Sequence, residues 1–491
     1  MKIIKSMFGL ALLSLVITSC NNELNFDTKR LVSDQQLEDL ANSSPEASLL
    51  INIGVEDGQY AFMREFATNF EVTGSRHDDF GQKSIDLGMD LLSNDMVQVQ
   101  DHWFGNYYAY RGRVQNFSTT KINFNYYYSI IRNVNSVIEQ IPVDATDSAL
   151  IHLRARALAL RAFSYFGLIR VYQYTYQGNQ GAAGVPLYAG DVNITSRATV
   201  QQVYDQILSD IDWAYNNITG YTRASKEKLN KAVIAGIYSR ILLETGTDYN
   251  KCAQLASEAK ASGSLMTNSS YVNDGFSLIS NSEWMWGADI NSETSTIYAS
   301  FFSHVASGNP GYAGLLGIYK SIDAKLYDAI PATDIRKQNF ADGNGSLPKY
   351  ANTKFFDFTF FEGDYVYMRV AEMYLNEAEA LARAGNDSQA QTVLFQLVSA
   401  RDSGYTQSTN TGQDLINEIL LQRRIELWGE GFAWFDMKRN KVDLNRDYPG
   451  TNHTAFGLFN FPYTDNQFLF QIPIEELDNN PDINVVDQNP L

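Results

Sequence analysis

The chain has 491 residues, of which 44% are hydrophobic and 19% charged, a composition typical of a folded globular protein. Its length is enough for one large core or roughly two to three ordinary domains. The formal net charge is −18, which excludes binding of nucleic acid through neutralisation of its phosphates. Anionic lipid surfaces would repel a chain of this charge unless it is anchored. Aromatic residues make up 13% of the chain. Its 29 tyrosines indicate surfaces that bind a ligand, although an aromatic-rich core would use most of the phenylalanines.

Residues 1–19 have the features of a secretory signal peptide. Lys2 and Lys5 precede the apolar run 7–17, which is too short to span a bilayer of about 30 Å. Cys20 directly follows a threonine and a serine, as in a bacterial lipobox. We predict cleavage before Cys20 and acylation of its thiol, and an ordinary signal peptide with a chance cysteine is the alternative. Acyl chains would hold the protein on a membrane, because each CH₂ group that they bury contributes about 0.8 kcal/mol to the free energy of membrane binding.

The segment 20–33 is polar at its start and is predicted to be a lipidated tether, with the folded body beginning at residue 34. Cys252 is the only other cysteine, so no intramolecular disulfide can form once Cys20 is acylated. An exported protein without disulfides depends on its core for stability. Cys252 lies in a helical pattern and is predicted to be a small buried hydrophobe, with a free reactive thiol as the alternative.

Three pairs of helices are predicted, each pair joined by a short connection. In the first helix Tyr127, Ile130 and Val134 recur at intervals of three and four residues, and Pro142 ends it. In the third pair the segment 377–382 alternates small and large residues, as tetratricopeptide repeats do where helices pack closely. A coiled-coil scaffold is the alternative, but turns come too often for one. The predicted helices cover 124–141, 147–169, 199–218, 225–245, 249–262, 366–383 and 388–401.

Between the second and third pairs lies a long irregular insertion, at about 263–364, rich in Gly, Asn, Ser and aromatic residues. Long loops in compact proteins are usually functional or disordered, and the aromatic content argues against disorder. Within the insertion Trp284 and Trp286 are two residues apart, so a strand would put both side chains on one face. The last portion, 441–491, is also loop-rich, with a short strand predicted at 467–472.

Charged and aromatic residues are mixed most densely in the stretch 422–440, QRRIELWGEGFAWFDMKRN. Just upstream, Leu415, Ile416 and Ile419 recur at helical spacing, so the segment has an apolar helical face. Charged residues are rarely buried unless they are paired, and the large aromatics favour an internal ion-pair lattice over a solvated face. We predict a central helix whose charges other helices hold. These charges belong to Arg423, Arg424, Glu426, Glu430, Asp436 and Arg439.

This stretch carries a resemblance to a known family. The pattern RR-x-E-L-x-x-E-G-x-x-x-x-D-M-x-R over 423–439 resembles the hallmark of the SusD/RagB family, surface nutrient-binding lipoproteins of Bacteroidetes bacteria. The family commonly has an arginine two residues after the second glycine, where this chain has Ala433, so one partner of the predicted lattice is missing. Further segments similar to the family's motifs follow in its order: L-R-A at 160–162, V-P-L at 185–187, I-P-x-x-E at 472–476 and Q-N-P at 488–490.

The resemblance implies a mostly α, SusD-like fold in a single domain over 34–491. Tetratricopeptide-like helical pairs at about 124–262 and 366–440 would form the scaffold, and the loop-rich remainder would carry the ligand face. It also implies a lipid-anchored protein on the outer face of the outer membrane. Such a protein captures oligosaccharide and passes it to a SusC-like TonB-dependent transporter, which the helical-repeat side is expected to contact. A relative that captures peptides on the same scaffold is an alternative.

The sequence predicts a binding protein and not an enzyme. It contains no G-x-S-x-G nucleophile elbow, no H-E-x-x-H and no P-loop type of phosphate-binding motif. Acidic residues are plentiful, but no pair stands out for glycoside hydrolysis, so an exported glycoside hydrolase is the less favoured alternative. No cofactor is predicted. Asp144, Asp147 and Asp289 lie in polar loops where calcium could bind, but nothing in their surroundings indicates a site.

Exposed aromatic rings beside polar side chains suit a sugar, whose C–H groups stack on an aromatic face while amides and charged groups bond the hydroxyls. In such pockets a few Trp or Tyr anchors carry most of the binding energy. The loop 101–108 and the insertion both fit, and for each the alternative is a ring packed into the body of the fold. The predicted ligand contacts are Trp103, Asn106, Tyr107, Trp284, Trp286 and Tyr298.

Overall fold

The computed structural model describes residue 40, residues 44–190 and residues 192–491. The predicted signal peptide, Cys20, the tether and the predicted start of the domain at 34–39 lie outside the described residues. Internal contacts divide the chain into Met1–Gly54 and Val55–Leu491, and the predicted domain boundaries stay a prediction. In the first unit, residues 45–54 are helical and belong to α3 (Pro45–Phe62). The elements and the site considered next belong to the second unit.

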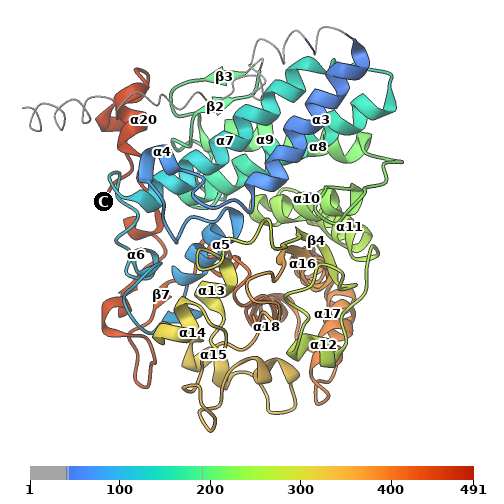
Figure 1. The fold of residues 1–491 in the computed structure, drawn as a ribbon. Helices are drawn as coiled ribbons and strands as arrows, with labels where there is room; N and C mark the ends of the chain where they lie inside the picture. Colours follow the sequence, from blue (N-terminus) through green and yellow to red (C-terminus); the bar gives the residue numbers. More distant parts are fainter. Residues whose placement is uncertain (1–39, 41–43, 191) are drawn as a thin grey trace, which may run out of the picture. The chain divides into compact units, whose positions relative to one another are not determined.

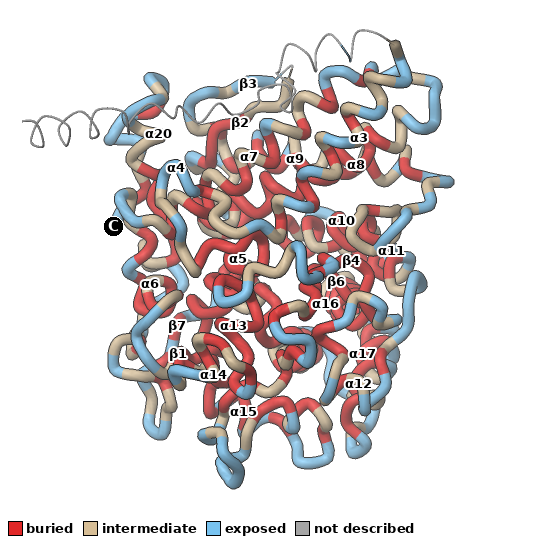
Figure 2. Tube along the Cα trace, in the orientation of Figure 1, coloured by how far each residue is buried: buried red, intermediate tan, exposed pale blue. Residues whose placement is uncertain are grey.

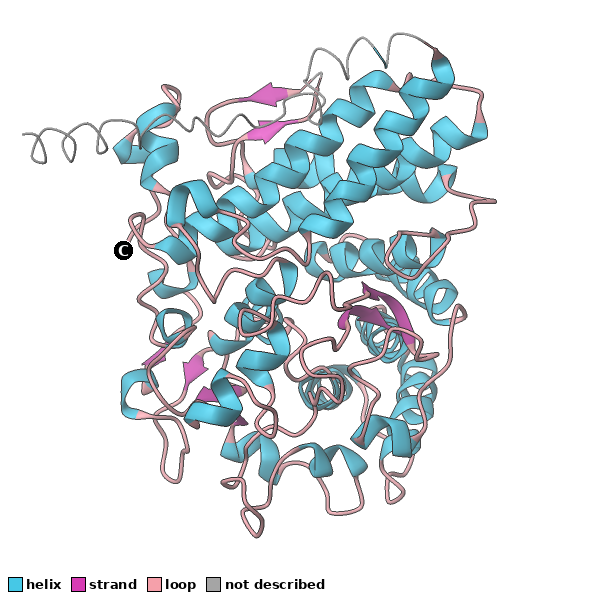
Figure 3. Cartoon of the chain, viewed as in Figure 1, coloured by secondary structure: helices cyan, strands magenta, loops and turns pink. Residues whose placement is uncertain are grey.

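The second unit is mainly helical with only short strands, which confirms the predicted fold class (Figures 1 and 3). Polar residues at the helix starts explain several of the boundaries. The carboxylate of Asp147 accepts the N–H of Ala149 at 2.7 Å at the start of α8, and Thr199 and Gln202 form a capping box at the start of α9. The long helices are α7 (Ser118–Gln140), α8 (Ser148–Tyr172), α9 (Val200–Asn217), α10 (Lys231–Thr245), α11 (Tyr249–Lys260), α16 (Val370–Arg383), α17 (Asp387–Arg401) and α18 (Gly412–Glu426).

These helices pack in series, α7 against α8, α8 against α9, α9 against α10 and α10 against α11. Helix α11 then packs against α16, although the insertion separates the two in sequence, and α16 packs against α17 and α18. Small residues permit the close approach: Ala371, Ala378 and Ala382 of α16 lie in one buried cluster with Leu394 of α17 and Leu415 of α18. The buried core follows these helices through the unit (Figure 2). The comparison with tetratricopeptide repeats remains a prediction.

The stretch 422–440 is not one helix, as the sequence predicts, but two. Helix α18 ends at Glu426, and the short helix α19 (Ala433–Arg439) follows a tight turn. Gly429 and Gly431 adopt φ of +79° and +92° in this turn, a region that favours glycine. A Cβ on Gly431 would also lie 2.7 Å from the Cβ of Asp86. The turn lets the chain reverse while it keeps charged residues of both helices together.

Other boundaries also differ from the prediction. Helix α10 begins at Lys231 instead of residue 225, and α16 begins at Val370 because the preceding residues form strand β6 (Tyr365–Arg369). Residues 467–472 form no strand. They begin inside the 3₁₀ turn η4 (Asn466–Phe468) and continue as extended chain whose N–H groups of Phe470 and Gln471 bond the carbonyls of Val171 and Arg113.

Among the described residues, the strands form four two-stranded antiparallel pairs, of which two join segments that are far apart in sequence. Strand β4 (Trp284–Ala288) pairs with β6 and closes the base of the insertion. Strand β1 (Met96–Gln98) pairs with β5 (Lys320–Ile322). The others are β2 (Leu187–Tyr188) with β3 (Asn193–Ile194) and β7 (Leu444–Asn445) with β8 (Asn460–Phe461). Short helices complete the unit: α4 (Phe70–Thr73), α5 (Gln82–Leu91), α6 (Gly105–Tyr108), α12 (Asn268–Val272), α13 (Phe301–Val305), α14 (Tyr312–Leu316), α15 (Ala324–Asp328), η2 (Ile335–Asn339), η3 (Ala455–Gly457), α20 (Ile474–Asn479) and η5 (Val485–Asp487).

Candidate functional site

Two carboxylates of the 422–440 stretch, Glu426 and Glu430, lie in a buried ion-pair lattice. Arg369 bonds both of them, at 2.7 Å to Glu426 and 2.8 Å to Glu430, and also bonds Glu283 at 2.6 Å. Arg401 bonds the second oxygen of Glu283 at 2.8 Å. Burial works to raise the pKa of Glu430, but Arg369 and Lys354 outweigh it and lower that pKa to about 2. The lattice comprises Glu283, Arg336, Lys354, Arg369, Arg401, Glu426 and Glu430.

Three of the remaining charges, those of Arg423, Asp436 and Arg439, form a second connected group. Arg423 bonds Asp436 at 2.6 Å, and Arg439 bonds the other oxygen of Asp436 at 2.8 Å and the buried Glu379. Arg424 makes a two-point contact with Asp95. All six predicted charges are thus paired, and five of them lie in the interior, whereas the side chain of Arg424 is 40% exposed. At Ala433, where the family resemblance leads us to expect an arginine, only the backbone N–H is engaged, with Asp90 at 3.0 Å.

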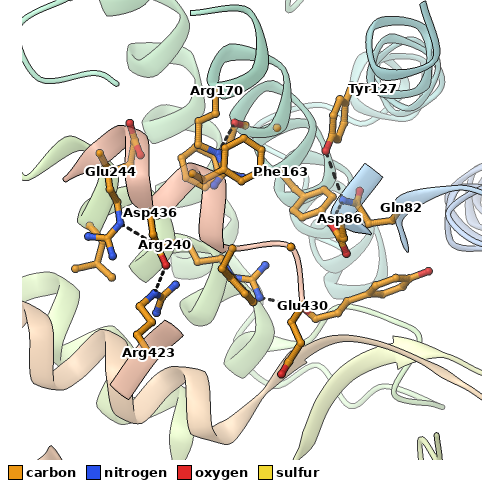
Figure 4. Close-up of a pocket in the computed structure, with 18 residues that line it drawn as sticks. Gln82, Asp86, Tyr127, Phe163, Arg170, Arg240, Glu244, Arg423, Glu430 and Asp436 are labelled. Carbon is orange, nitrogen blue, oxygen red and sulfur yellow. Dashed lines mark hydrogen bonds and ion pairs between the residues drawn. The ribbon is translucent and has the colours of Figure 1, made fainter. Parts of the chain in front are cut away.

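A polar cavity of about 50 Å³ lies beside this second group (Figure 4). Its lining includes four arginines and four acids, so its formal charge is balanced: Arg170, Arg240, Arg423, Arg439, Asp86, Glu244, Glu430 and Asp436. The guanidinium of Arg170 is sandwiched between Phe166 and Phe435, 3.8 and 3.9 Å from the ring centroids. A polar space of this size suits a few ordered waters. The cavity therefore belongs to the interior of the scaffold and is too small for a sugar.

The structure places three of the six predicted ligand contacts inside the fold. Trp284 and Trp286 are buried, and their indole N–H groups each donate a 2.8 Å bond to a backbone carbonyl, of Gly275 and Glu227. Tyr107 is also buried, and its hydroxyl accepts a bond from Asn123 at 3.0 Å. The prediction that these rings contact a ligand is therefore corrected. A bulge in β4 lies between the two tryptophans, so Trp284 pairs with Arg369 and Trp286 with Met368, on opposite faces of the strand pair.

The strand pair β1–β5 brings the loop 101–108 next to the insertion. Gln98 pairs with Lys320, and the N–H of Val99 donates to the carbonyl of Tyr319 at 3.2 Å. Residues that follow β1 therefore lie beside residues that precede β5. As a result, the ring of His102, after β1, lies 5.4 Å from the ring of Tyr312, before β5.

Trp103 and Tyr298, both predicted contacts, lie on either side of Tyr312. The ring of His77 stacks on Trp103 at 5.4 Å and 20°, and meets Tyr312 edge-on at 5.0 Å and 76°. Tyr298 lies 6.1 Å from Tyr312 at 81° and is 46% exposed, and Trp103 is half-buried. The ring of Tyr312 is thus steeply inclined to those of His77 and Tyr298, whereas the rings of His77 and Trp103 are nearly parallel. The aromatic face comprises His77, His102, Trp103, Tyr298 and Tyr312.

The aromatic face rests on buried groups that fix its central ring. The buried His304 of α13 stacks under Tyr312 at 5.0 Å and 5°. Burial, with the nearby charge of Lys320, lowers the pKa of His304 well below its usual value, so this imidazole is neutral. Helix α13 and the start of α14 also approach each other closely. At Gly311 there is no space for a side chain, since a Cβ there would lie 2.7 Å from the Cα of Ser303. Tyr312 is therefore held in one orientation.

Cations near the aromatic face are paired or buried. Arg76 lies 5.3 Å from the centre of the Trp103 ring and forms a two-point contact with Asp78 at 2.9 Å. Arg111 bonds Asp101 at 2.6 Å, with both side chains exposed. Burial lowers the pKa of Lys320 to about 7. The arrangement offers rings and hydrogen-bonding groups and little net positive charge.

Sequence reasoning missed three members of the aromatic face. His77 and His102 stand in no motif of the sequence, and only the folded chain brings them to Tyr312. Tyr312 ends the Gly-, Asn- and Pro-containing run 307–312 of the insertion, and that run is a signal that could have found it. The remaining predicted contact, Asn106, is half-buried beside Trp103, and its carbonyl accepts the N–H of Gly112 at 2.9 Å.

A separate groove of about 1010 Å³ lies on the helical side of the unit. Helices α4, α7 and α20 and the β2–β3 hairpin line it with amide, hydroxyl and aromatic side chains, including Tyr128, Asn133 and Tyr188. Phe70 projects at its edge and is 63% exposed. The groove holds none of the six predicted ligand contacts.

Among the described residues, no group of three or more histidine, cysteine or acidic side chains is placed to hold a metal ion. Of the three aspartates considered for calcium, Asp147 caps helix α8. Cys252 is buried, its thiol donates to the carbonyl of Ser239 at 3.3 Å, and burial raises its pKa, so it is not a reactive thiol. In the same described part of the chain, no helix has both the length and the apolar character that a membrane span needs.

Comparison with known proteins agrees with the motifs. A model described as the SusD family matches residues 331–491, and a model described as starch-binding associating with outer membrane matches residues 82–243. The chain is thus similar to the SusD family in one segment and to a SusD-like family in the other. The first match includes the 422–440 stretch, and the second includes Trp103, Asn106 and Tyr107.

Individual SusD-like proteins resemble nearly the whole chain. A SusD-like protein P38 of Formosa agariphila is 24% identical over 88% of this chain and 91% of its own length. The crystal structure of a SusD-like carbohydrate-binding protein from Bacteroides vulgatus is 25% identical, with a TM-score of 0.77 over 90% of this chain and 98% of that one. A laminarin-binding SusD-like protein is 17% identical, with a TM-score of 0.65 over 90% and 99%. The two solved structures are described as those of binding proteins.

Proposed function

We propose that this protein binds a glycan on the aromatic face and delivers it to a SusC-like transporter in the outer membrane. The observation that carries the proposal is the convergence of two predicted contacts, Trp103 and Tyr298, on Tyr312. Relatives described as carbohydrate-binding and laminarin-binding support it. Starch-binding and the outer membrane appear in the description of the family model that matches 82–243.

On this proposal the rings act as stacking platforms for sugar C–H groups. Asn106, beside Trp103, would bond a sugar hydroxyl. Because the nearby cations are already paired with Asp78 and Asp101, stacking and hydrogen bonds would supply the binding energy, with little contribution from net charge.

Delivery rests on two further parts of the proposal. Acylation at Cys20 would keep the protein on the outer face of the outer membrane. The helical array would contact the transporter, with the bound glycan released into the channel. No chemistry on the glycan is required, and we propose that the protein is not an enzyme.

The test compares Trp103→Ala with Phe70→Ala, which removes an exposed ring from the groove on the helical side. Retardation on gels that contain soluble starch or laminarin measures polymer binding. We expect Trp103→Ala to weaken retardation by about fivefold or more, because removing an anchor ring typically costs over about 1 kcal/mol. Phe70→Ala should match the wild type, and all three proteins should melt alike.

Other outcomes would redirect the proposal. Loss of binding in Phe70→Ala but not in Trp103→Ala would place the ligand in the groove. Capture of peptides but not glycans from matched pools would favour the peptide-binding alternative. Release of reducing sugar by the purified protein, abolished by changing one carboxylate, would contradict the proposal that it is not an enzyme.

A further inference from the structure

The polar cavity beside α8, α10 and α19 contains an arginine without an acidic partner. Arg170 of α8 lies between the rings of Phe166 and Phe435, and its Nε donates to the carbonyl of Phe166 at 3.0 Å. A guanidinium has five N–H donors, and the side chain of Arg170 forms no other hydrogen bond or ion pair among the described residues. Because this side chain lines the cavity (Figure 4), its four remaining donors are left for whatever the cavity contains.

The acids of the cavity lining are bonded to other groups. Glu244 accepts the hydroxyl of Thr175 at 2.8 Å, and Asp86 lies 3.5 Å from the Nζ of Lys83. Glu430 belongs to the ion-pair lattice. These three carboxylates therefore do not neutralise the guanidinium between the two rings by direct contact.

The other three arginines of the lining all have acidic partners. Arg423 and Arg439 share Asp436, at 2.6 and 2.8 Å. Arg240 bonds both oxygens of Glu372 at 2.6 Å. The formal charge of the lining is balanced, but among the described residues one of its four guanidinium groups has no carboxylate in contact with it.

The surroundings of Arg170 are also short of negative charge. The ammonium of Lys438 in α19 donates to the carbonyls of Arg170, Gln173 and Phe468, and to no carboxylate of the described residues. Burial lowers the pKa of both Arg170 and Lys438, and the carboxylate of Glu244 opposes this shift only in part. A buried charge is costly unless a counter-charge lies close to it. This region therefore favours an additional negative charge.

We propose that the cavity binds a small monovalent anion of the size of chloride, held by the Nη donors of Arg170. Water in the cavity would accept the same N–H bonds but would bring no charge. The space of about 50 Å³ is large enough for such an ion and too small for a sugar or an organic acid. The anion would hold α8 and α19 together, because the two rings that enclose Arg170 belong to these two helices.

The test compares thermal unfolding in sodium chloride and in sodium gluconate at equal ionic strength, because gluconate is too large for the cavity. At a chloride concentration a hundred times the dissociation constant, we expect the unfolding midpoint of the wild type to be about 2–3 °C higher in chloride. Arg170→Met should abolish this difference. The measured quantity is the difference between the two salts, so a change in the stability of the variant itself does not affect the comparison.

Arg132→Met is the matched control. Arg132 is an exposed arginine of α7 that forms no ion pair among the described residues, so it resembles Arg170 in all but its surroundings. This variant should retain the difference between chloride and gluconate. Arg170→Met should still bind laminarin as the wild type does, because the inference is independent of the proposed function of the aromatic face.

A crystal grown in sodium bromide gives a second measurement that needs no variant. Bromide replaces chloride and is located by its anomalous scattering, and we expect a peak in the cavity against the guanidinium of Arg170. Equal midpoints of the wild type in both salts would overturn the inference and leave water as the content of the cavity. An equal effect of chloride on the wild type and on Arg170→Met, or bromide peaks only outside the cavity, would also overturn it by placing the anion elsewhere.

Discussion

The ion-pair lattice and the aromatic face use similar residue types for opposite purposes. In the lattice, charged side chains are fully buried and bonded to one another, and aromatic rings pack around them. On the aromatic face, rings reach the surface and charged residues remain in exposed or partly exposed pairs. The lattice joins Glu283 at the base of the insertion to Arg369 and to Glu426 of α18. It therefore fixes the base of the segment whose far end carries Tyr298 and Tyr312.

The largest expected effect is on the lattice. Arg369→Met would leave the buried carboxylates of Glu283, Glu426 and Glu430 without their shared partner. We expect a loss of about 3–5 kcal/mol in the free energy of unfolding, the usual result of breaking a buried ion pair. Urea unfolding measures it. Lys251→Gln, which removes one member of a surface pair with Asp212, should cost less than about 1 kcal/mol. A similar small loss for both variants would show that the lattice contributes little to stability.

The second prediction sharpens the contrast between buried and exposed tryptophans. Trp286→Ala would leave a large cavity and an unbonded carbonyl at Glu227, so we expect a loss of about 3–5 kcal/mol in stability. Trp103→Ala should change the stability by less than about 1 kcal/mol. Thermal unfolding followed by circular dichroism distinguishes the two. Unchanged melting of Trp286→Ala together with lost glycan binding would instead place that ring against the ligand.

The sequence was informative where a local pattern determines the structure. Helical periodicity and capping residues such as Asp147 located the helices, and the mixture of arginine, glutamate and tryptophan at 422–440 indicated paired charges. The spacing of Trp284 and Trp286 would put both rings on one face of a regular strand, but a bulge in β4 turns them to opposite faces, and both are buried. The turn at Gly429 and Gly431 divides the predicted central helix, and helical periodicity alone did not reveal it.

Long-range contacts set the rest of the site. The ring of His77 reaches Tyr312 across more than two hundred residues of sequence, and the three-residue pairing of β1 with β5 aligns the neighbouring loops. Strands this short carry too little pattern to be recognised in one sequence.

The smallest expected effect concerns the surface pair Asp101–Arg111 beside Trp103. Asp101→Asn would free the guanidinium of Arg111, and because both side chains are exposed, stability should change by less than about 1 kcal/mol. Affinity for polygalacturonate should rise a few-fold at low salt, and the gain should fall at physiological salt, where the Debye length is about 8 Å. Binding to laminarin should not change.

Arg111→Gln serves as the control, because it removes the cation and should bring no gain. A gain on laminarin, or one that persists in high salt, would mean that the substitution acts on the shape of the loop instead of its charge. If the expected results are found, this surface ion pair affects ligand choice and not stability, because water screens the interaction between its charges. The buried ion pairs of the lattice are not screened by water, so they affect stability.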